Sequence, residues 1–184
     1  HKKEPRHCEG GIAALAMTAI FYTAKQHLPF FDTLKKPAAA AAGFGGYVIG
    51  DYAFSGCSSL TSITIPDSVT TIGESAFNLC TGLVSVTIGD GLTEISDYLF
   101  SRCSSLLHVT IGDAVTRIGY DAFNECYNLS SVVIPASVTS IDTYAFYYCT
   151  NLWHVLYKGT EAQWNSIQIG SYNLPLTYAI RHNG

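Results

Sequence analysis

Apolar residues recur along this chain with a fixed spacing of 23 residues, from Ile49 to Tyr157. The phenylalanine, cysteine and leucine columns of this repeat are Phe54, Phe77, Phe100, Phe123 and Phe146, then Cys57, Cys80, Cys103, Cys126 and Cys149, then Leu60, Leu83, Leu106, Leu129 and Leu152. One unit is A-F-x-x-C-x-x-L-x-x-I-x-I-P-x-x-V-T-x-I-G. Such a unit cannot bury its own apolar face, whereas stacked copies share one interior. The pattern therefore predicts a repeat solenoid of five coils.

Each unit contains two segments that favour extended backbone. At the end of L-x-x-I-x-I, apolar and polar residues alternate, as in Ile63, Thr64 and Ile65, which is typical of a half-buried strand. Equivalent strands of successive units would pair in parallel about 4.8 Å apart, so five coils would span about 20 to 25 Å. The V-T-x-I-G stretch predicts a second extended limb, and turn residues separate the two limbs. These turn dipeptides are Pro66-Asp67, Gly89-Asp90, Gly112-Asp113 and Pro135-Ala136.

The repeat divides the chain into three parts: a non-repeat segment over 1–48, five units over 49–157 and a C-terminal module over 158–184. Thr160 followed by Gln163 is the pattern of a capping box, which predicts a short helix. This helix would lay Trp164 and Ile167 over the last coil, whose apolar ladders would otherwise meet water. We therefore expect residues 158–184 to form a C-terminal cap.

The first 48 residues leave several interpretations open. The apolar stretch from Gly11 to Tyr22 has the length of a secretory signal core. Good helix formers between Gly11 and Gln26, with Pro37 beyond them, are equally consistent with a helical N-terminal cap, and a disordered segment is the third possibility. Because the chain has no run of about 18 apolar residues, no membrane-spanning helix is expected.

Composition narrows the class of partner. Of 184 residues, 48% are hydrophobic and only 13% are charged, and the formal net charge is -4. This balance gives room for one domain with a sizeable core. It lacks the basic surface that nucleic acids require, so no nucleic-acid partner is expected. A surface supplied by Ser, Thr, Asn, Tyr and Gly favours a secreted or cell-surface protein.

Most of the cysteine and aspartate residues that could carry chemistry occupy repeat positions. The cysteine column contains no C-x-x-C pair for zinc. Side chains that point the same way along a ladder also disfavour disulfide geometry, so we expect packed, reduced thiols. Asp67, Asp90 and Asp113 are either turn residues that cap local backbone or ligands of a shared calcium ion, and the turn interpretation is favoured. No nucleophile elbow, phosphate loop or H-E-x-x-H helix occurs. We therefore expect no catalytic residue, no metal site and no cofactor.

The outward positions of the predicted strands are the best candidates for a ligand surface, because a solenoid presents them as one regular face. They form one stripe of Ser62, Ser85, His108, Ser131 and His154, and another of Thr64, Thr87, Thr110, Val133 and Leu156. Toward Trp153 and Leu156 the surface becomes aromatic and apolar, which suits binding hot spots. The alternatives are a binding face and a merely solvated sheet.

The A-F-x-x-C-x-x-L spacing, repeated five times with Leu99 in place of one alanine, resembles the BspA-like leucine-rich repeats of bacterial and protist surface proteins. The resemblance runs from Ile49 to Ile180, and its tail resembles the terminal module of such arrays. It implies a right-handed, β-rich leucine-rich-repeat superhelix with a short parallel strand per coil. It also implies an extracellular or cell-surface location and non-catalytic binding or adhesion to a protein or glycan on host or neighbouring cells.

Family members are usually longer, so this chain is expected to be a fragment. The alternative function is a structural spacer repeat that carries other domains of a longer surface protein.

Overall fold

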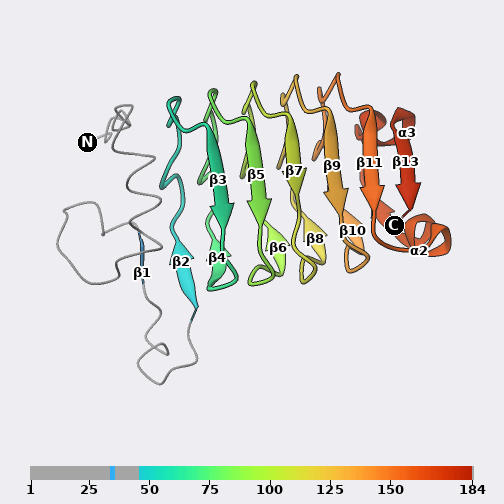
Figure 1. The fold of residues 1–184 in the computed structure, drawn as a ribbon, viewed down its shortest axis with the longest axis horizontal. Coiled ribbons are helices and arrows are strands. Elements are labelled where there is room, and N and C mark those ends of the chain that lie inside the picture. The colour runs from blue at the N-terminus through green and yellow to red at the C-terminus, as the bar shows by residue number, and fades with distance from the viewer. Residues whose placement is uncertain (1–33, 36–45, 184) are drawn as a thin grey trace.

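The computed structural model describes residues 34–35 and 46–183, and within them the chain winds as a parallel-strand solenoid (Figure 1). The predicted signal core from Gly11 to Tyr22 and the predicted helix from Gly11 to Gln26 lie outside the described residues. The fold predicted from the 23-residue period is confirmed.

A six-stranded parallel sheet forms one side of the solenoid. In spatial order its strands are β13 (Ile180–Asn183), β11 (His154–Tyr157), β9 (Ser131–Ile134), β7 (His108–Thr110), β5 (Ser85–Ile88) and β3 (Ser62–Ile65). From β3 to β11, paired residues are 23 positions apart, as Ser62 is from Ser85. Units of equal length keep the strands in register, so each sequence column becomes a spatial row.

The second limb of each coil is also extended, as predicted. Its strands are β4 (Val69–Ile72), β6 (Glu94–Ile95), β8 (Arg117–Ile118), β10 (Ser140–Ile141) and β12 (Gln168–Ile169). The last four form a parallel sheet in the order β12-β10-β8-β6. Strand β4 instead pairs in parallel with β2 (Tyr47–Ile49), which pairs antiparallel with β1 (Leu34–Lys35). Strand β2 thus places a second limb ahead of the first complete unit.

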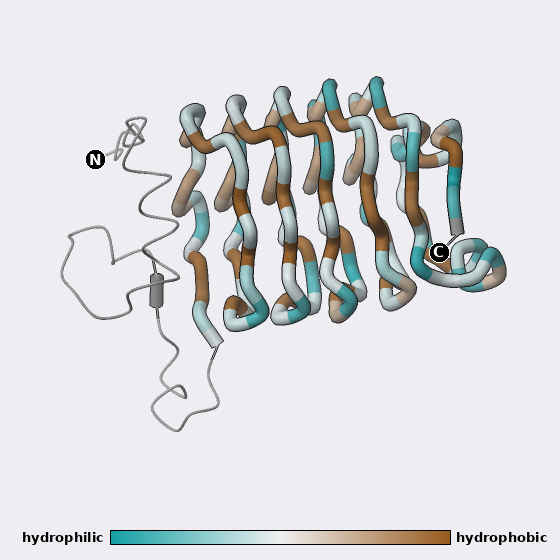
Figure 2. The backbone as a smooth tube through the Cα atoms, viewed as in Figure 1, coloured by the Kyte–Doolittle hydropathy of each residue, from teal (hydrophilic) through white to brown (hydrophobic). Residues whose placement is uncertain are grey.

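The repeat columns fill the space between the two limbs. In β3 the pattern alternates, with Ile63 and Ile65 buried and Ser62 and Thr64 exposed. The five phenylalanine rings form one stack, with successive centroids 5.1 to 5.6 Å apart. Figure 2 shows the apolar stretches recurring at the same level in every coil. The core is therefore a set of ladders that runs the length of the solenoid.

The cysteine column is a ladder of hydrogen-bonded thiols. Cys80 donates from Sγ to the carbonyl oxygen of Phe54 at 3.1 Å, and Cys103, Cys126 and Cys149 repeat this bond at 3.2 Å one coil further on each time. These four thiols are free and buried, and burial raises the pKa of Cys126 and of Cys149 well above the usual range. Cys57 is disulfide-bonded, so the expectation of a fully reduced column is wrong there. Cys57 is the first cysteine of the column and has a repeat cysteine on one side only. The expectation of reduced thiols assumed neighbouring cysteines that point the same way, so it does not apply to the other side of Cys57.

Each coil contains two residues with left-handed backbone, in the turns around the Ala-Phe pair. One column is Tyr52, Ser75, Tyr98, Asp121 and Tyr144, and the other is Gly56, Leu79, Arg102, Glu125 and Tyr148. Left-handed backbone costs a residue other than glycine about 1 to 2 kcal/mol. Hydrogen bonds to the next coil hold these turns, since the amide of Tyr52 donates to the carbonyl of Glu74 at 3.0 Å. The stacked neighbour thus offsets a strain that one coil alone would carry.

The C-terminal module begins with the predicted helix. Helix α2 (Glu161–Ser166) has both bonds of the capping box between Thr160 and Gln163, and Trp164 is buried edge-on against Tyr157 at 5.2 Å. Helix α3 (Leu174–Tyr178) follows. Before it, the buried side chain of Asn173 accepts the amide hydrogen of Phe146 at 2.9 Å, where the preceding coil uses the carbonyl of Ala145. The module also adds a strand to each sheet, β12 and β13, which the repeat pattern did not predict.

Candidate functional site: the outer face of the six-stranded sheet

The strand face, defined as the outward side chains of β3, β5, β7, β9, β11 and β13, contains both predicted stripes. Burial alternates along each strand, so the polar or variable positions lie outside and the isoleucine and valine columns lie inside. The residues placed outside are Ser62, Thr64, Ser85, Thr87, His108, Thr110, Ser131, Val133, His154 and Leu156. The predicted location of these residues is confirmed, whereas their role in binding remains a prediction.

The N-terminal two thirds of the strand face is rich in hydroxyl groups. Serine or threonine occupies both outward positions of β3 and β5. His108 of β7 lies beside Ser131 of β9, with 2.7 Å between His108 Nδ1 and Ser131 Oγ. His154 is one strand beyond Ser131, so the two histidines of the stripe are two strands apart, as the sequence predicted. This part of the face offers many polar groups but few rigid anchors.

The C-terminal end of the strand face is aromatic and apolar. Trp153 is 61% exposed, Leu156 40% and Ile180 56%. The ring of His154 stacks on that of His182 from β13, with centroids 5.6 Å apart. Ile180 and His182 were missed from the sequence, because Ile180 pairs with His154 across a spacing of 26 residues and so falls outside the repeat.

A row of exposed apolar residues leads toward Trp153. Val84 and Leu107 are each 37% exposed and occupy the same position of their units, immediately before the strand. Trp153 occupies that position two units after Leu107, with Ser130 between them. This column therefore forms an apolar border that is interrupted at Ser130 and ends at Trp153.

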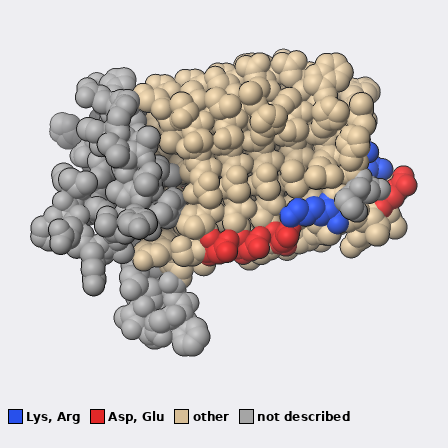
Figure 3. All heavy atoms as spheres, in the orientation of Figure 1, with Lys and Arg blue, Asp and Glu red and all other residues tan. Residues whose placement is uncertain are grey.

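No lysine, arginine, aspartate or glutamate occurs at the outward positions from β3 to β11, and Figure 3 shows a continuous uncharged surface. Figure 3 shows charge along one border instead, as an acidic row followed by a basic group. Contacts from turn to turn join Asp67, Asp90, Asp113 and Lys158 in such a row.

Each acidic turn supports the next one. Asp67 Oδ1 accepts the amide of Asp90 at 2.8 Å, and Asp90 Oδ1 accepts that of Asp113 at 2.6 Å. Lys158 Nζ lies 2.6 Å from Asp113 Oδ1. Among the residues that the structure describes, no group of three His, Cys, Asp or Glu could hold a metal ion. These contacts support the turn interpretation over a shared calcium ion.

Taken together, the strand face is regular and uncharged, and its backbone is held by the ladder bonds of its neighbours. Exposed aromatic residues with few rotatable bonds are typical anchors of protein interfaces, and charged residues are depleted at the centres of such interfaces. Across the described part of the chain, no helix has the length and apolar character needed to cross a bilayer. The stacked coils, the leucine column and the open strand face define a protein of the leucine-rich-repeat class.

Comparison with family models identifies the kind of repeat. Six copies of the BspA type leucine rich repeat region match residues 46–160. The chain belongs to the BspA-type leucine-rich repeat family. A comparison with curated proteins finds no match.

Solved structures of similar proteins agree with this assignment. A leucine rich cell surface protein from Faecalibacterium prausnitzii is 32% identical with a TM-score of 0.66, and the match covers 73% of this chain and 40% of that one. The Leucine Rich Repeat protein of T. pallidum is 34% identical with a TM-score of 0.56, over 67% of this chain and 62% of the other. A leucine-rich repeat protein from Eubacterium ventriosum is 28% identical with a TM-score of 0.59, over 72% and 33%. This chain thus spans between a third and two thirds of the length of these relatives.

Proposed function

We propose that this chain is a non-catalytic binding module that attaches to a protein on host or neighbouring cells through the strand face. The observation that carries the proposal is the exposed cluster of Trp153, Leu156 and Ile180 at one end of an uncharged sheet. An aromatic anchor on a rigid support loses little conformational freedom on binding, so most of its contact energy contributes to affinity. The hydroxyl-rich remainder of the face would supply the polar surroundings.

An extracellular or cell-surface location is part of this proposal. The similar protein from F. prausnitzii is described as a cell surface protein, and the low charge and hydroxyl-rich surface of this chain suit the same setting. Residues 158–184 would act as the cap of the array, because Trp164, Ile167 and Leu176 cover the end of the apolar ladders.

The experiment is a saturation-binding assay on immobilised extracellular-matrix proteins and on whole cells, comparing the unmodified chain with variants. Trp153→Ala should weaken binding about tenfold or more, the loss typical of a hot spot. His108→Ala and His154→Ala should each have smaller effects. Tyr52→Ala is the matched control, since Tyr52 is also 61% exposed but lies in the turn before the Ala-Phe pair, away from the strand face.

The competing function is a structural spacer that carries other domains. It predicts no saturable binding to any matrix protein or cell, and equal behaviour of Trp153→Ala and Tyr52→Ala. That result, with both variants folded by circular dichroism, would refute the binding proposal. Unfolding caused by Trp153→Ala would equally count against it, because a residue this exposed should contribute little to the core.

A further inference from the structure

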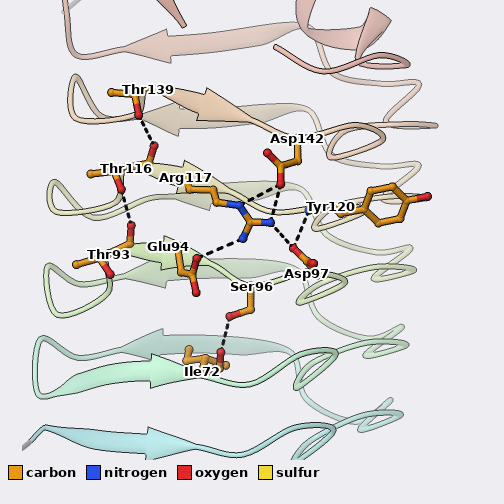
Figure 4. A network of polar contacts seen from close by, with 10 residues as sticks. All are labelled: Ile72, Thr93, Glu94, Ser96, Asp97, Thr116, Arg117, Tyr120, Thr139 and Asp142. Atoms are coloured by element: carbon orange, nitrogen blue, oxygen red, sulfur yellow. Dashed lines mark hydrogen bonds and ion pairs between the residues drawn. The ribbon is translucent and has the colours of Figure 1, made fainter. Parts of the chain in front are cut away.

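The sheet on the other limb carries a second feature, an open hollow of about 520 Å³ at the step from β10 to β12. Its walls are Tyr120, Ser140, Ile141, Asp142, Thr143, Gln168, Ile169 and Gly170. Figure 4 shows Asp142 paired with Arg117, and the ring of Tyr120 extending away from this ion pair. The volume falls within the range of about 300 to 1,000 Å³ that is usual for small-molecule sites.

The hollow arises from a break in one repeat column. Arg117, Ser140 and Gln168 occupy the same row on neighbouring strands β8, β10 and β12. The long side chain of Arg117 covers the surface over β8, whereas Ser140 is too short to cover the surface over β10. The space above β10 is therefore open, with Gln168 on its far side.

Arg117 is paired with three carboxylates beside the hollow, so negative charge is in excess there. Arg117 Nη2 lies 2.8 Å from Asp97 Oδ1 and 2.6 Å from Asp142 Oδ2, and its Nη1 lies 3.2 Å from Glu94 Oε2. The guanidinium is thus occupied by carboxylates, which disfavours a phosphate or sulfate ligand. Oδ2 of Asp142 is paired with the guanidinium, and among the described residues no group of three His, Cys, Asp or Glu could hold a metal ion. The excess of carboxylates disfavours an anion, and the lack of a metal-binding group leaves a neutral ligand as the best match.

Side chains supply several unused hydrogen-bonding groups in the hollow. The backbone amides of Gln168 and Gly170 already donate to Thr139 and Ile141, at 2.9 and 2.8 Å. Among the described residues, no hydrogen bond uses Asp142 Oδ1, the hydroxyls of Ser140 and Thr143, or the side-chain amide of Gln168. Together these groups can donate hydrogen bonds, from the hydroxyls and the amide, and accept them, at the carboxylate as well. Such a set matches a ligand with several adjacent hydroxyl groups better than a peptide strand.

An aromatic ring bounds the same hollow. Tyr120 is held by edge contacts with Tyr98 at 5.4 Å and Tyr144 at 5.7 Å, and Tyr144 stacks on Tyr172 at 4.5 Å. The electron-rich face of an aromatic ring attracts the slightly positive C–H groups on one face of a pyranose. A fixed ring beside hydroxyl, amide and carboxylate groups is therefore complementary to a sugar.

We propose that this hollow binds a neutral hexopyranose unit of a glycan, with Tyr120 against the sugar face and Asp142, Thr143 and Gln168 bonded to its hydroxyls. The site lies on a different sheet from the strand face and does not depend on the function proposed for that face. Because the hollow is open, we expect dissociation constants in the millimolar range for a single ring.

The test is a titration of the ¹⁵N-labelled chain, followed by amide chemical shifts. The probes are the methyl glycosides of glucose, galactose, mannose and N-acetylglucosamine, with inorganic phosphate and triglycine for comparison. At least one glycoside should produce saturable shifts at Ile141, Thr143 and Gly170. Ser140→Gln, which fills the hollow with a neutral side chain, should weaken this binding about tenfold or more. Thr71→Gln is the matched control, because Thr71 is the equivalent residue three units earlier and does not line the hollow.

Gln168→Ala provides an independent variant should Ser140→Gln fail to fold, and it should also weaken the binding. The proposal is overturned if no glycoside gives saturable shifts, if the shifts persist in the folded variants, or if phosphate or triglycine binds more tightly. Shifts confined to the strand face would overturn it as well. Trp153→Ala should leave sugar binding unchanged, so failure of either proposal can be told from failure of the other.

Discussion

The phenylalanine stack gives the sharpest test of the ladder architecture. Phe100 is fully buried, and its ring lies between those of Phe77 at 5.5 Å and Phe123 at 5.6 Å. Replacing it with alanine removes two stacked contacts and leaves a cavity in the middle coil. A buried Phe→Ala change costs about 3 to 5 kcal/mol, and a position with an aromatic pair on both sides should fall near the upper end of that range.

Phe54→Ala is the matched comparison, because Phe54 is 4% exposed and stacks on one described ring, Phe77, at 5.1 Å. An aromatic pair contributes about 0.5 to 1.5 kcal/mol beyond burial, so Phe54→Ala should cost about 1 kcal/mol less than Phe100→Ala. The measurement is urea unfolding followed by circular dichroism for the whole array. Fluorescence of Trp153 and Trp164 reports on the C-terminal end.

Coincident transitions by the two probes allow the free energies of unfolding to be compared directly. Separate transitions in Phe100→Ala would show that the two ends of the array unfold independently once the middle coil is destabilised, as expected when coils contact only their neighbours. The reasoning fails if Phe100→Ala costs less than about 2 kcal/mol, or if Phe54→Ala costs more than Phe100→Ala.

Three further predictions follow from the described contacts. Burial raises the pKa of Cys126 and Cys149, so the native thiols should resist a thiol reagent that labels the urea-unfolded chain. Because the thiols of the unfolded chain ionise at a lower pH than those of the native chain, the free energy of unfolding should fall as pH rises above about 9. This fall should be smaller in Cys126→Ala. Equal labelling of native and unfolded chain would contradict this. Thr160→Ala should lower the free energy of unfolding by about 1 kcal/mol through loss of the capping box, whereas Thr160→Ser should lower it little. Thermal unfolding measures both variants, and equal losses would exclude the hydroxyl hydrogen bond as the cause. Asp90→Ala should lower the free energy of unfolding by about 1 kcal/mol because the amide of Asp113 loses its acceptor, while Asp90→Asn should lower it less because it keeps an acceptor oxygen. A rise in melting temperature on adding calcium would instead support the interpretation of these aspartates as calcium ligands.

How far the sequence predicts the structure depends on whether a feature repeats. Equal unit length fixes strand register, so the columns of Phe54 and Cys57 predicted the core, and Ser62 and Thr64 predicted the strand face. The capping box at Thr160 was also predictable, because its bonds are local. The bonds of Asp67 and Asp90 to the next turn agree with the turn interpretation drawn from their residue type.

The remaining features arise where the repeat is broken or ends. Ile180 joins the sheet only because helices α2 and α3 return the chain beside β11, and no spacing in the sequence specifies that return. Asn173 replaces a backbone acceptor with a side-chain oxygen, which has no counterpart in the repeat. The hollow beside Tyr120 depends on one short residue, Ser140, in a row where Arg117 is long. Such features depend on tertiary neighbours rather than on the period.

The two left-handed positions in each coil limit how this array can diverge by mutation. Side chains branched at Cβ are the least tolerant of positive φ, and proline cannot adopt it. Across both columns the chain has tyrosine, serine, aspartate, leucine, arginine, glutamate or glycine, and never valine, isoleucine, threonine or proline. The outward strand positions carry no such restriction and already range from serine to histidine and leucine. Duplication of a unit therefore copies the two left-handed turns together with outward strand positions that can change without disturbing the stack.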